Sequence, residues 1–171
     1  ACVVDCPFGA IMDKSYLVDV IRLLKDEKKV YAIVAPAISS QFNHSKIGKV
    51  ITAIKKLGFE DVFEAALGAD LVAFHECNEF KEKDELDFMT TSCCPAFVSY
   101  IEKNYPELKE CISNTVSPMI AIARLIKSQN KDAKTVFIGP CIAKKTEAKR
   151  NEVSGDVDYV LTFEELLALL D

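Results

Sequence analysis

The sequence lacks the features that mark membrane, secreted and nucleic-acid-binding proteins. No apolar run among its 171 residues approaches the roughly 18 to 20 residues that a membrane-spanning helix needs. No charged and then apolar leader precedes a small-residue cleavage site. The formal net charge is -5 at pH 7, and acidic and basic residues are interspersed, so no patch predicts binding to nucleic acid or to an anionic membrane. We therefore expect a soluble, cytoplasmic protein with neither partner.

Internal repeats, low-complexity linkers and an initiator methionine are also missing. The chain begins at Ala1 and Cys2, which predicts that it was cut from a longer protein. Half of the residues are apolar and 27% are charged, as in an ordinary globular protein with one substantial core.

Cysteine is present in quantity, with seven residues in the chain. Without a secretion signal, this number favours thiolate chemistry or metal binding in a reducing compartment over a disulfide framework. The spacing of the cysteines therefore indicates which of them could bind a metal.

Hydrophobic periodicity predicts alternating strands and helices. Expected strands cover residues 30–35, 59–64, 86–91, 135–139 and 158–161, and expected helices cover 15–25, 46–57, 66–83, 96–104, 117–128 and 162–170. This alternation predicts an α/β fold, a mostly parallel sheet flanked by helices. Chemistry in such sheets gathers at the carboxyl ends of strands, which here are followed by residues 35–37, 91–95 and 139–144.

Cys2 and Cys6, with a proline after Cys6, match the last third of the bacterial ferredoxin pattern that binds 4Fe–4S clusters. The alternative is two incidental cysteines at a frayed chain end.

Cys93 and Cys94 are adjacent and lie just before Pro95, where a helix is expected to begin. Neighbouring side chains on a turn point in different directions, so one can bind a metal while the other stays a free thiol. The positive end of the helix dipole favours the thiolate form of either. The alternative is a buried pair of small apolar residues.

Cys141 and Lys144 are three residues apart, close to one helical turn, so both side chains are expected on one side. An ammonium group there could offset the charge of a thiolate-bound cluster and donate hydrogen bonds to an anionic ligand. The alternative is a solvated lysine, which is commoner.

Two of these motifs resemble signatures of the iron-only (FeFe) hydrogenases. Residues 91–95 (Thr-Ser-Cys-Cys-Pro) match the first signature, and residues 140–145 (Pro-Cys-Ile-Ala-Lys-Lys) with Glu147 resemble the second. Residues 34–37 and 104–118 take part in the resemblance as well. It implies that residues 1–14 end a ferredoxin-like 4Fe–4S segment and that residues 15–171 form the first part of the catalytic domain, one lobe of the domain that holds the H-cluster.

The resemblance also implies roles for individual residues. Cys94 and Cys141 would be two of the four thiolates that hold the H-cluster cubane, and Cys93 would pass protons to its diiron unit. Lys144 would hydrogen-bond a cyanide of that unit. The implied pocket lining is Ala35, Pro36 and Pro140, and the implied proton relay is Glu76, Glu79 and, between them, Ser113. The alternative for the acidic pair is a solvated helix face.

The implied activity is the reversible reduction of two protons by two electrons to H2, with ferredoxin or another carrier as electron partner and dedicated maturation proteins. One rival is a hydrogenase-like iron–sulfur assembly protein, which the presence of Cys93 and Lys144 disfavours. The other is a hydrogen sensor without high turnover.

Some residues depart from the family pattern. Gly139 replaces a methionine and Phe97 a tryptophan of better known enzymes, which favours a divergent subgroup. A third signature, with the other two cubane ligands, is absent, so we expect the chain alone to hold no complete H-cluster. Cys77 and Cys111 match no ligand position and are predicted to be buried structural thiols. His44 and His75 are expected to be surface or packing residues.

Overall fold

The computed structural model describes residues 6–26, 29–42, 45–83 and 85–171. Four parallel strands in the order β2-β1-β3-β4 form its sheet. They are β1 (Val30–Val34), β2 (Asp61–Glu64), β3 (Lys134–Ile138) and β4 (Tyr159–Leu161). All five residues of β1 are buried, because both faces of this central strand are covered. The predicted α/β class with a parallel sheet is confirmed.

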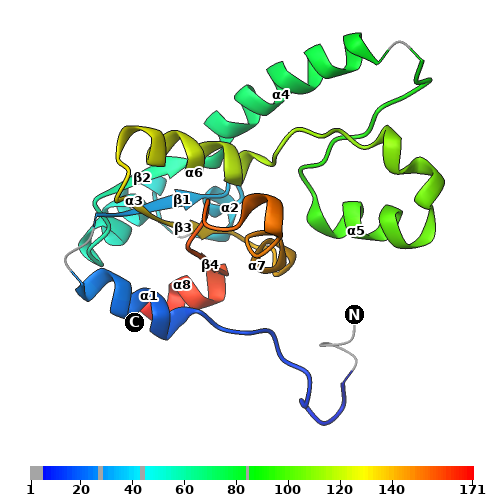
Figure 1. Ribbon diagram of the computed structural model, residues 1–171. Coiled ribbons are helices and arrows are strands. Elements are labelled where there is room, and N and C mark those ends of the chain that lie inside the picture. The colour runs from blue at the N-terminus through cyan, green and yellow to red at the C-terminus, as the bar shows by residue number, and fades with distance from the viewer. Residues whose placement is uncertain (1–5, 27–28, 43–44, 84) are drawn as a thin grey trace.

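Helices flank the sheet on both faces (Figure 1). They are α1 (Leu17–Lys25), α2 (Ile38–Gln41), α3 (Ile47–Lys56), α4 (Ala65–Glu82), α5 (Pro95–Asn104), α6 (Pro118–Gln129), α7 (Ala143–Glu147) and α8 (Phe163–Leu170), with 3-10 turns at η1 (Pro106–Cys111) and η2 (Asn151–Val153). In the view of Figure 1, α4 and α6 lie above the sheet, and α1 and α8 lie below it. None of the helices in the described part of the chain is long and apolar enough to cross a membrane.

Part of the core lies between α6 and the strands, and buried residues of α1, α3 and α8 also belong to it. α6 contributes Met119, Ile120, Ile122, Ala123 and Ile126, each at most 3% exposed. Burying side chains of this size stabilises a fold by roughly 1.5 to 3 kcal/mol each. This packing fixes the carboxyl ends of β1 and β3, from which two of the predicted site loops depart.

α4 crosses α6 at Gly68, where the two backbones come unusually close. A Cβ atom at this position would lie 2.3 Å from the carbonyl oxygen of Pro118 and 2.8 Å from Cγ1 of Ile122. Only a glycine allows this approach. Beyond the crossing, the rest of α4 extends away from the sheet (Figure 1).

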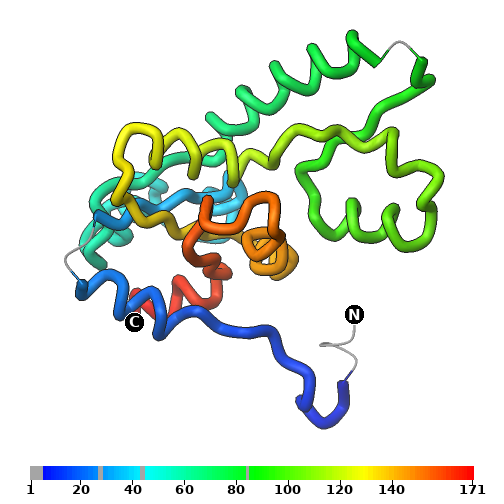
Figure 2. Tube along the Cα trace, in the orientation of Figure 1, coloured from blue at the N-terminus to red at the C-terminus, as the bar shows by residue number. Residues whose placement is uncertain are grey.

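The predicted strand over residues 86–91 is wrong. The segment makes a single bridge, between Thr90 and Ile112, and none of its residues is buried. A strand in a sheet covered on both faces must bury its side chains, and this segment has no layer to pack against. It belongs instead to an excursion that includes α5 and returns to the sheet through α6, coloured green in Figure 2. Residues 91–95 therefore do not follow a sheet strand.

Candidate functional site

The two signature loops meet through Lys144. Its Nζ donates a hydrogen bond to the carbonyl oxygen of Cys93 at 2.9 Å and forms an ion pair with Glu147 Oε2 at 2.6 Å. The Lys144 side chain is 12% exposed and that of Glu147 is 9% exposed. The alternative of a solvated lysine is thus excluded, because this ammonium group is largely buried and paired. Residues 51 positions apart in the sequence are brought together at one place.

The cysteines of this region differ in exposure. Cys94 is the residue before the first turn of α5, with Pro95 at its start as predicted, and Cys93 and Cys94 are both exposed. The sulfur of Cys93 lies 3.5 Å from the Thr91 hydroxyl. Cys141 is half-buried, and its carbonyl oxygen accepts a hydrogen bond from the backbone N–H of Lys144 at 3.3 Å.

Free thiols of this kind suit iron–sulfur chemistry, which uses thiolate ligands. Their number does not suffice, however. Within residues 6–26, 29–42, 45–83 and 85–171, no three histidine, cysteine, aspartate or glutamate side chains gather closely enough to hold a metal ion. The donor type therefore fits a cluster, whereas the donor set in this part of the chain is incomplete.

The loops after β1 and β3 lie side by side at the carboxyl edge of the sheet. The Ala35 N–H donates to the Ile138 carbonyl at 2.9 Å, and Pro36 and Pro140 are both exposed. Between them, a Cβ atom on Gly139 would lie 2.6 Å from the Phe137 ring and 3.1 Å from Ala35 Cβ. The Phe137 ring thus occupies the space that a larger residue at position 139 would need.

Glu79 lies in a dense set of hydrogen bonds. Ser113 donates its hydroxyl proton to Glu79 Oε2 at 2.6 Å, the Asn114 N–H donates to Oε1 at 2.9 Å, and Lys83 forms an ion pair at 2.8 Å. Partial burial raises the pKa of this carboxyl, but the bonds from Lys83, Ser113 and Asn114 outweigh it and lower the pKa to about 2. Glu79 is therefore ionised at every physiological pH.

Glu76 lies one turn earlier on α4 and reaches the first signature loop. Its Oε1 accepts a hydrogen bond from the backbone N–H of Ser92 at 3.4 Å, next to Cys93. The Ser92 hydroxyl donates in turn to the carbonyl of Thr115, which joins this loop to the segment before α6. Both carboxylates are therefore hydrogen-bonded within the protein, Glu76 to Ser92 and Glu79 to Ser113, which excludes the alternative of a purely solvated helix face.

Ser113 makes a direct contact with one of the two carboxylates. It is 4% exposed and donates to Glu79, and among the described residues no hydrogen bond joins it to Glu76. Glu76 instead accepts a hydrogen bond from the backbone of Ser92.

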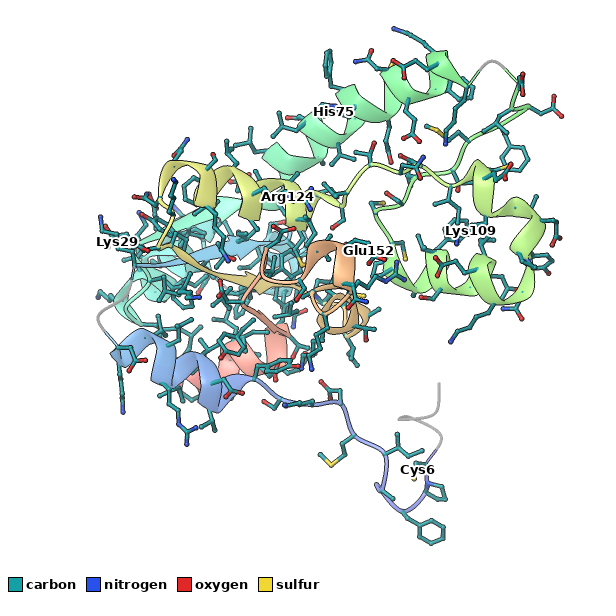
Figure 3. All side chains as sticks on the ribbon, viewed as in Figure 1. Cys6, Lys29, His75, Lys109, Arg124 and Glu152 are labelled. Atoms are coloured by element: carbon teal, nitrogen blue, oxygen red, sulfur yellow. The ribbon has the colours of Figure 1, made fainter. Side chains whose placement is uncertain are left out.

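Cys6 lies near the end of an extended segment that leaves α1 and runs away from the sheet (Figure 3). A turn follows it, closed by the Gly9 N–H bonding the Cys6 carbonyl at 3.2 Å, with Gly9 at a φ of 61°. Backbone N–H groups of Phe8, Ala10 and Ile11 lower the pKa of the Cys6 thiol. This environment favours the thiolate, the form that binds metals. Cys2 lies outside the described residues.

The two cysteines predicted to be buried are not. Cys77 is exposed on α4, and Cys111 is half-buried in η1. The prediction assumed that a cysteine without a ligand role fills a core, but both elements lie at the margin of the molecule. His75 is exposed on α4 as expected (Figure 3), and His44 lies outside the described residues.

Comparison with known proteins identifies the family. The family model described as "Iron only hydrogenase large subunit, C-terminal domain" matches residues 28–171. The NADP-reducing hydrogenase subunit HndD of Solidesulfovibrio fructosivorans is 30% identical, covering 99% of this chain and 34% of the relative. Iron hydrogenase 1 of Clostridium pasteurianum is 31% identical, with 96% and 33% covered. The cytosolic Fe-S cluster assembly factor NAR1 of Meyerozyma guilliermondii is 32% identical, with 90% and 34% covered.

The chain thus spans about a third of the length of these relatives. The match includes both signature loops, which Lys144 joins in the structure. The chain belongs to the family of the iron-only hydrogenase large subunit, C-terminal domain.

Proposed function

We propose that the intact protein is an iron-only hydrogenase that catalyses the reversible reduction of two protons by two electrons to H2. The observation that carries the proposal is the position of Lys144, a largely buried ammonium bound to the Cys93 carbonyl and to Glu147. A charged group is costly to bury unless it is paired, so this lysine is held in place for a purpose that a solvated surface lysine does not serve.

In this proposal, Cys94 and Cys141 would be two ligands of the H-cluster cubane, and Cys2 and Cys6 would each be a ligand of a 4Fe–4S cluster whose other thiolates come from outside residues 1–171. When bound, these clusters supply electrons and the site at which hydrogen forms or splits. The two further cubane ligands would come from sequence outside residues 1–171. With the diiron unit bound, Lys144 would donate a hydrogen bond toward its anionic ligands, and Ala35, Pro36 and Pro140 would line the pocket.

Proton transfer is assigned to groups of this chain. Cys93 holds a proton at its sulfur, and a thiol can both give and take one. Glu76 on α4 accepts a hydrogen bond from the backbone of Ser92, the residue next to Cys93. The proposed proton path then continues through Glu79 and Ser113 toward the protein surface. Since its low pKa makes Glu79 a weak base, its carboxylate orients the Ser113 hydroxyl and holds a proton only briefly.

The remaining partners and the location follow from the same proposal. Ferredoxin or another small electron carrier exchanges electrons with the cluster near Cys6, and maturation proteins insert the diiron unit. The protein works in the cytoplasm.

A second candidate function is assembly of iron–sulfur clusters, because NAR1 relatives match this chain about as well as hydrogenases do. A hydrogen sensor would share the chemistry of the enzyme but turn over slowly. Measurements of hydrogen production and uptake distinguish the hydrogenase, the assembly factor and the hydrogen sensor.

The test is hydrogen evolution from reduced methyl viologen, and hydrogen uptake, by the full-length protein expressed with hydrogenase maturation enzymes. A hydrogenase shows rapid turnover in proportion to its diiron content, measured by infrared bands of the cyanide and carbonyl ligands. Those bands with only trace turnover would replace the proposal by the sensor. Iron–sulfur clusters without the bands and without gas production would replace it by the assembly factor.

A further inference from the structure

Lys145 follows Lys144 in α7 but binds a different part of the molecule. Its Nζ forms ion pairs with Asp13 at 2.7 Å and Glu165 at 3.0 Å, and donates a hydrogen bond to the Lys14 carbonyl at 2.9 Å. The side chain is 7% exposed. An ammonium has three donors, and all three are used here. Neither the signature motifs nor the proposed proton path gives this lysine a role.

The partners of Lys145 tie together segments that are far apart in the sequence. Glu165, near the start of α8, also accepts a hydrogen bond from the Tyr16 N–H at 3.2 Å. The Tyr16 ring is 8% exposed and packs against the Tyr159 ring at 5.7 Å between centroids. Residues 13–16 are thus held by α7, by α8 and by β4. We call the set of Asp13, Lys145 and Glu165 the latch.

Residues 7–12 on the other side of the latch have no such support. Every one of them is exposed. Figure 3 shows this stretch running from the body of the molecule to Cys6. The place of Cys6 relative to the sheet therefore depends on where residues 13–16 are fixed. Loss of the latch would free the segment without removing any core residue.

The short helix α7 therefore contacts both the first signature loop and the segment that leads to Cys6. Lys144 binds the loop of Cys93 and Cys94, and Lys145 binds the segment that leads to Cys6. The two lysines are consecutive on a helix of five residues, so both segments are bound to the same short element.

We propose that Lys145 is a positioning residue that fixes residues 13–16, from which the Cys6 segment departs, to the helix that also binds the Cys93 loop, and so sets the electron path between the two iron–sulfur sites. The inference rests on the proposed function, since it takes Cys6 and Cys94 as cluster ligands. With both clusters bound, electrons would pass one at a time between the 4Fe–4S cluster near Cys6 and the cubane, in either direction. Lys145 takes no part in the chemistry at the hydrogen-binding site.

The experiment compares two reactions of the full-length, matured protein. Exchange between D2 and water protons needs the hydrogen-binding site but no electron transfer out of the protein. Hydrogen oxidation coupled to a ferredoxin needs the whole electron path. The variants are Asp13→Asn, which leaves Lys145 paired with Glu165, and Lys145→Met. The control is Lys131→Met, which removes an exposed lysine charge elsewhere.

We expect both latch variants to keep the exchange rate of the wild type and to lose ferredoxin-coupled oxidation several-fold, while the control keeps both. Equal losses in the two reactions would overturn the proposal, because they would mean general damage. Unchanged rates in Asp13→Asn and Lys145→Met would overturn it as well.

Absence of D2 exchange would contradict the proposed function but would not bear on the latch. A second measurement tests the latch in that case. Limited proteolysis of residues 7–14 should be several-fold faster in Asp13→Asn than in wild type or Lys131→Met. Equal cleavage rates would show that the latch does not hold the segment.

Discussion

At the scale of single residues, paired charges decide which way the lysines of α7 point. Lys144 and Lys145 are neighbours, yet each has its own carboxylate and carbonyl partners on a different side of the helix. Burial lowers and the ion pairs raise the pKa of Lys145, and the ion pairs prevail. Ion pairs orient both side chains, and removing either side chain leaves a carboxylate without that partner.

The first prediction concerns Lys144→Met. Glu147 would remain 9% exposed with no cation beside it, and breaking a buried pair in this way costs about 3 kcal/mol. Urea unfolding should show this loss, whereas the exposed Lys131→Met should stay within about 0.5 kcal/mol of wild type. Equal stabilities of the two variants would mean that the Lys144–Glu147 pair does not contribute to the stability of the fold.

The second prediction concerns the pH dependence contributed by Glu79. Its folded-state pKa of about 2 lies below the ordinary value of 4.5, so its stabilisation is complete above about pH 4.5 and is lost as pH falls toward 2. Glu79→Gln should cost about 2 kcal/mol at neutral pH, with some of the full linkage energy lost to screening near the surface.

That cost should shrink as the pH falls from about 4.5 to about 2, because the wild type then loses the same interaction. Urea unfolding of both proteins across this range measures it. A difference that is constant with pH would show that the Glu79 charge is not what stabilises the segment of Ser113 and Asn114.

At the scale of elements, hydrophobic periodicity and local chemistry predicted helices and strands correctly where tertiary packing agreed with them. The expected helix over residues 66–83 is α4 (Ala65–Glu82), and the expected strand over 135–139 is β3 (Lys134–Ile138). The segment over 86–91 has a strand-like composition, but strand formation needs a neighbour and a layer to cover it, and these are tertiary features. The short helix α7 follows Cys141 without any periodic signal, since five residues are too few to show one.

The third prediction tests the crossing of α4 and α6. Gly68→Ala should destabilise the fold by about 2 kcal/mol, because its Cβ would lie 2.3 Å from the Pro118 carbonyl and the helices must separate. Gly48→Ala is the matched control on α3, where a Cβ meets nothing within 4 Å. It should be neutral or stabilise by about 0.5 kcal/mol. Thermal unfolding compares the two, and similar effects would contradict the tight approach.

At the scale of the whole molecule, the signatures predicted which loops form the candidate site, and the structure shows that Lys144 joins the two signature loops. The Lys144 contact joins residues 51 apart, and the Lys145 contact with Asp13 joins residues 132 apart. Nothing in the spacing of Asp13, Lys145 and Glu165 marks them as partners, because contacts across such distances follow from the finished fold. The hydrogen bond between Ser113 and Glu79 was partly anticipated, but only the resemblance to hydrogenases suggested it.

The fourth prediction concerns metal binding by residues 1–171 alone. Within the described part of the chain no complete ligand set gathers, and resemblance supplies only two cubane thiolates, Cys94 and Cys141. Anaerobic reconstitution with iron and sulfide should therefore give no H-cluster, and Cys2 and Cys6 alone are too few to hold a 4Fe–4S cluster, which takes four thiolates. Iron analysis and infrared spectra after incubation with maturation proteins measure this. A full cluster with its diiron unit would contradict it.

The central claim is that Cys93 passes protons at a hydrogen-activating cluster, and one comparison tests it most directly. Hydrogen evolution from reduced methyl viologen is measured for the full-length, matured wild type, for Cys93→Ser and for Cys77→Ser, which removes an exposed thiol of α4. The account predicts that Cys93→Ser loses nearly all turnover while its iron content and infrared bands match the wild type, and that Cys77→Ser stays active. Full activity of Cys93→Ser with an intact cluster would contradict the account.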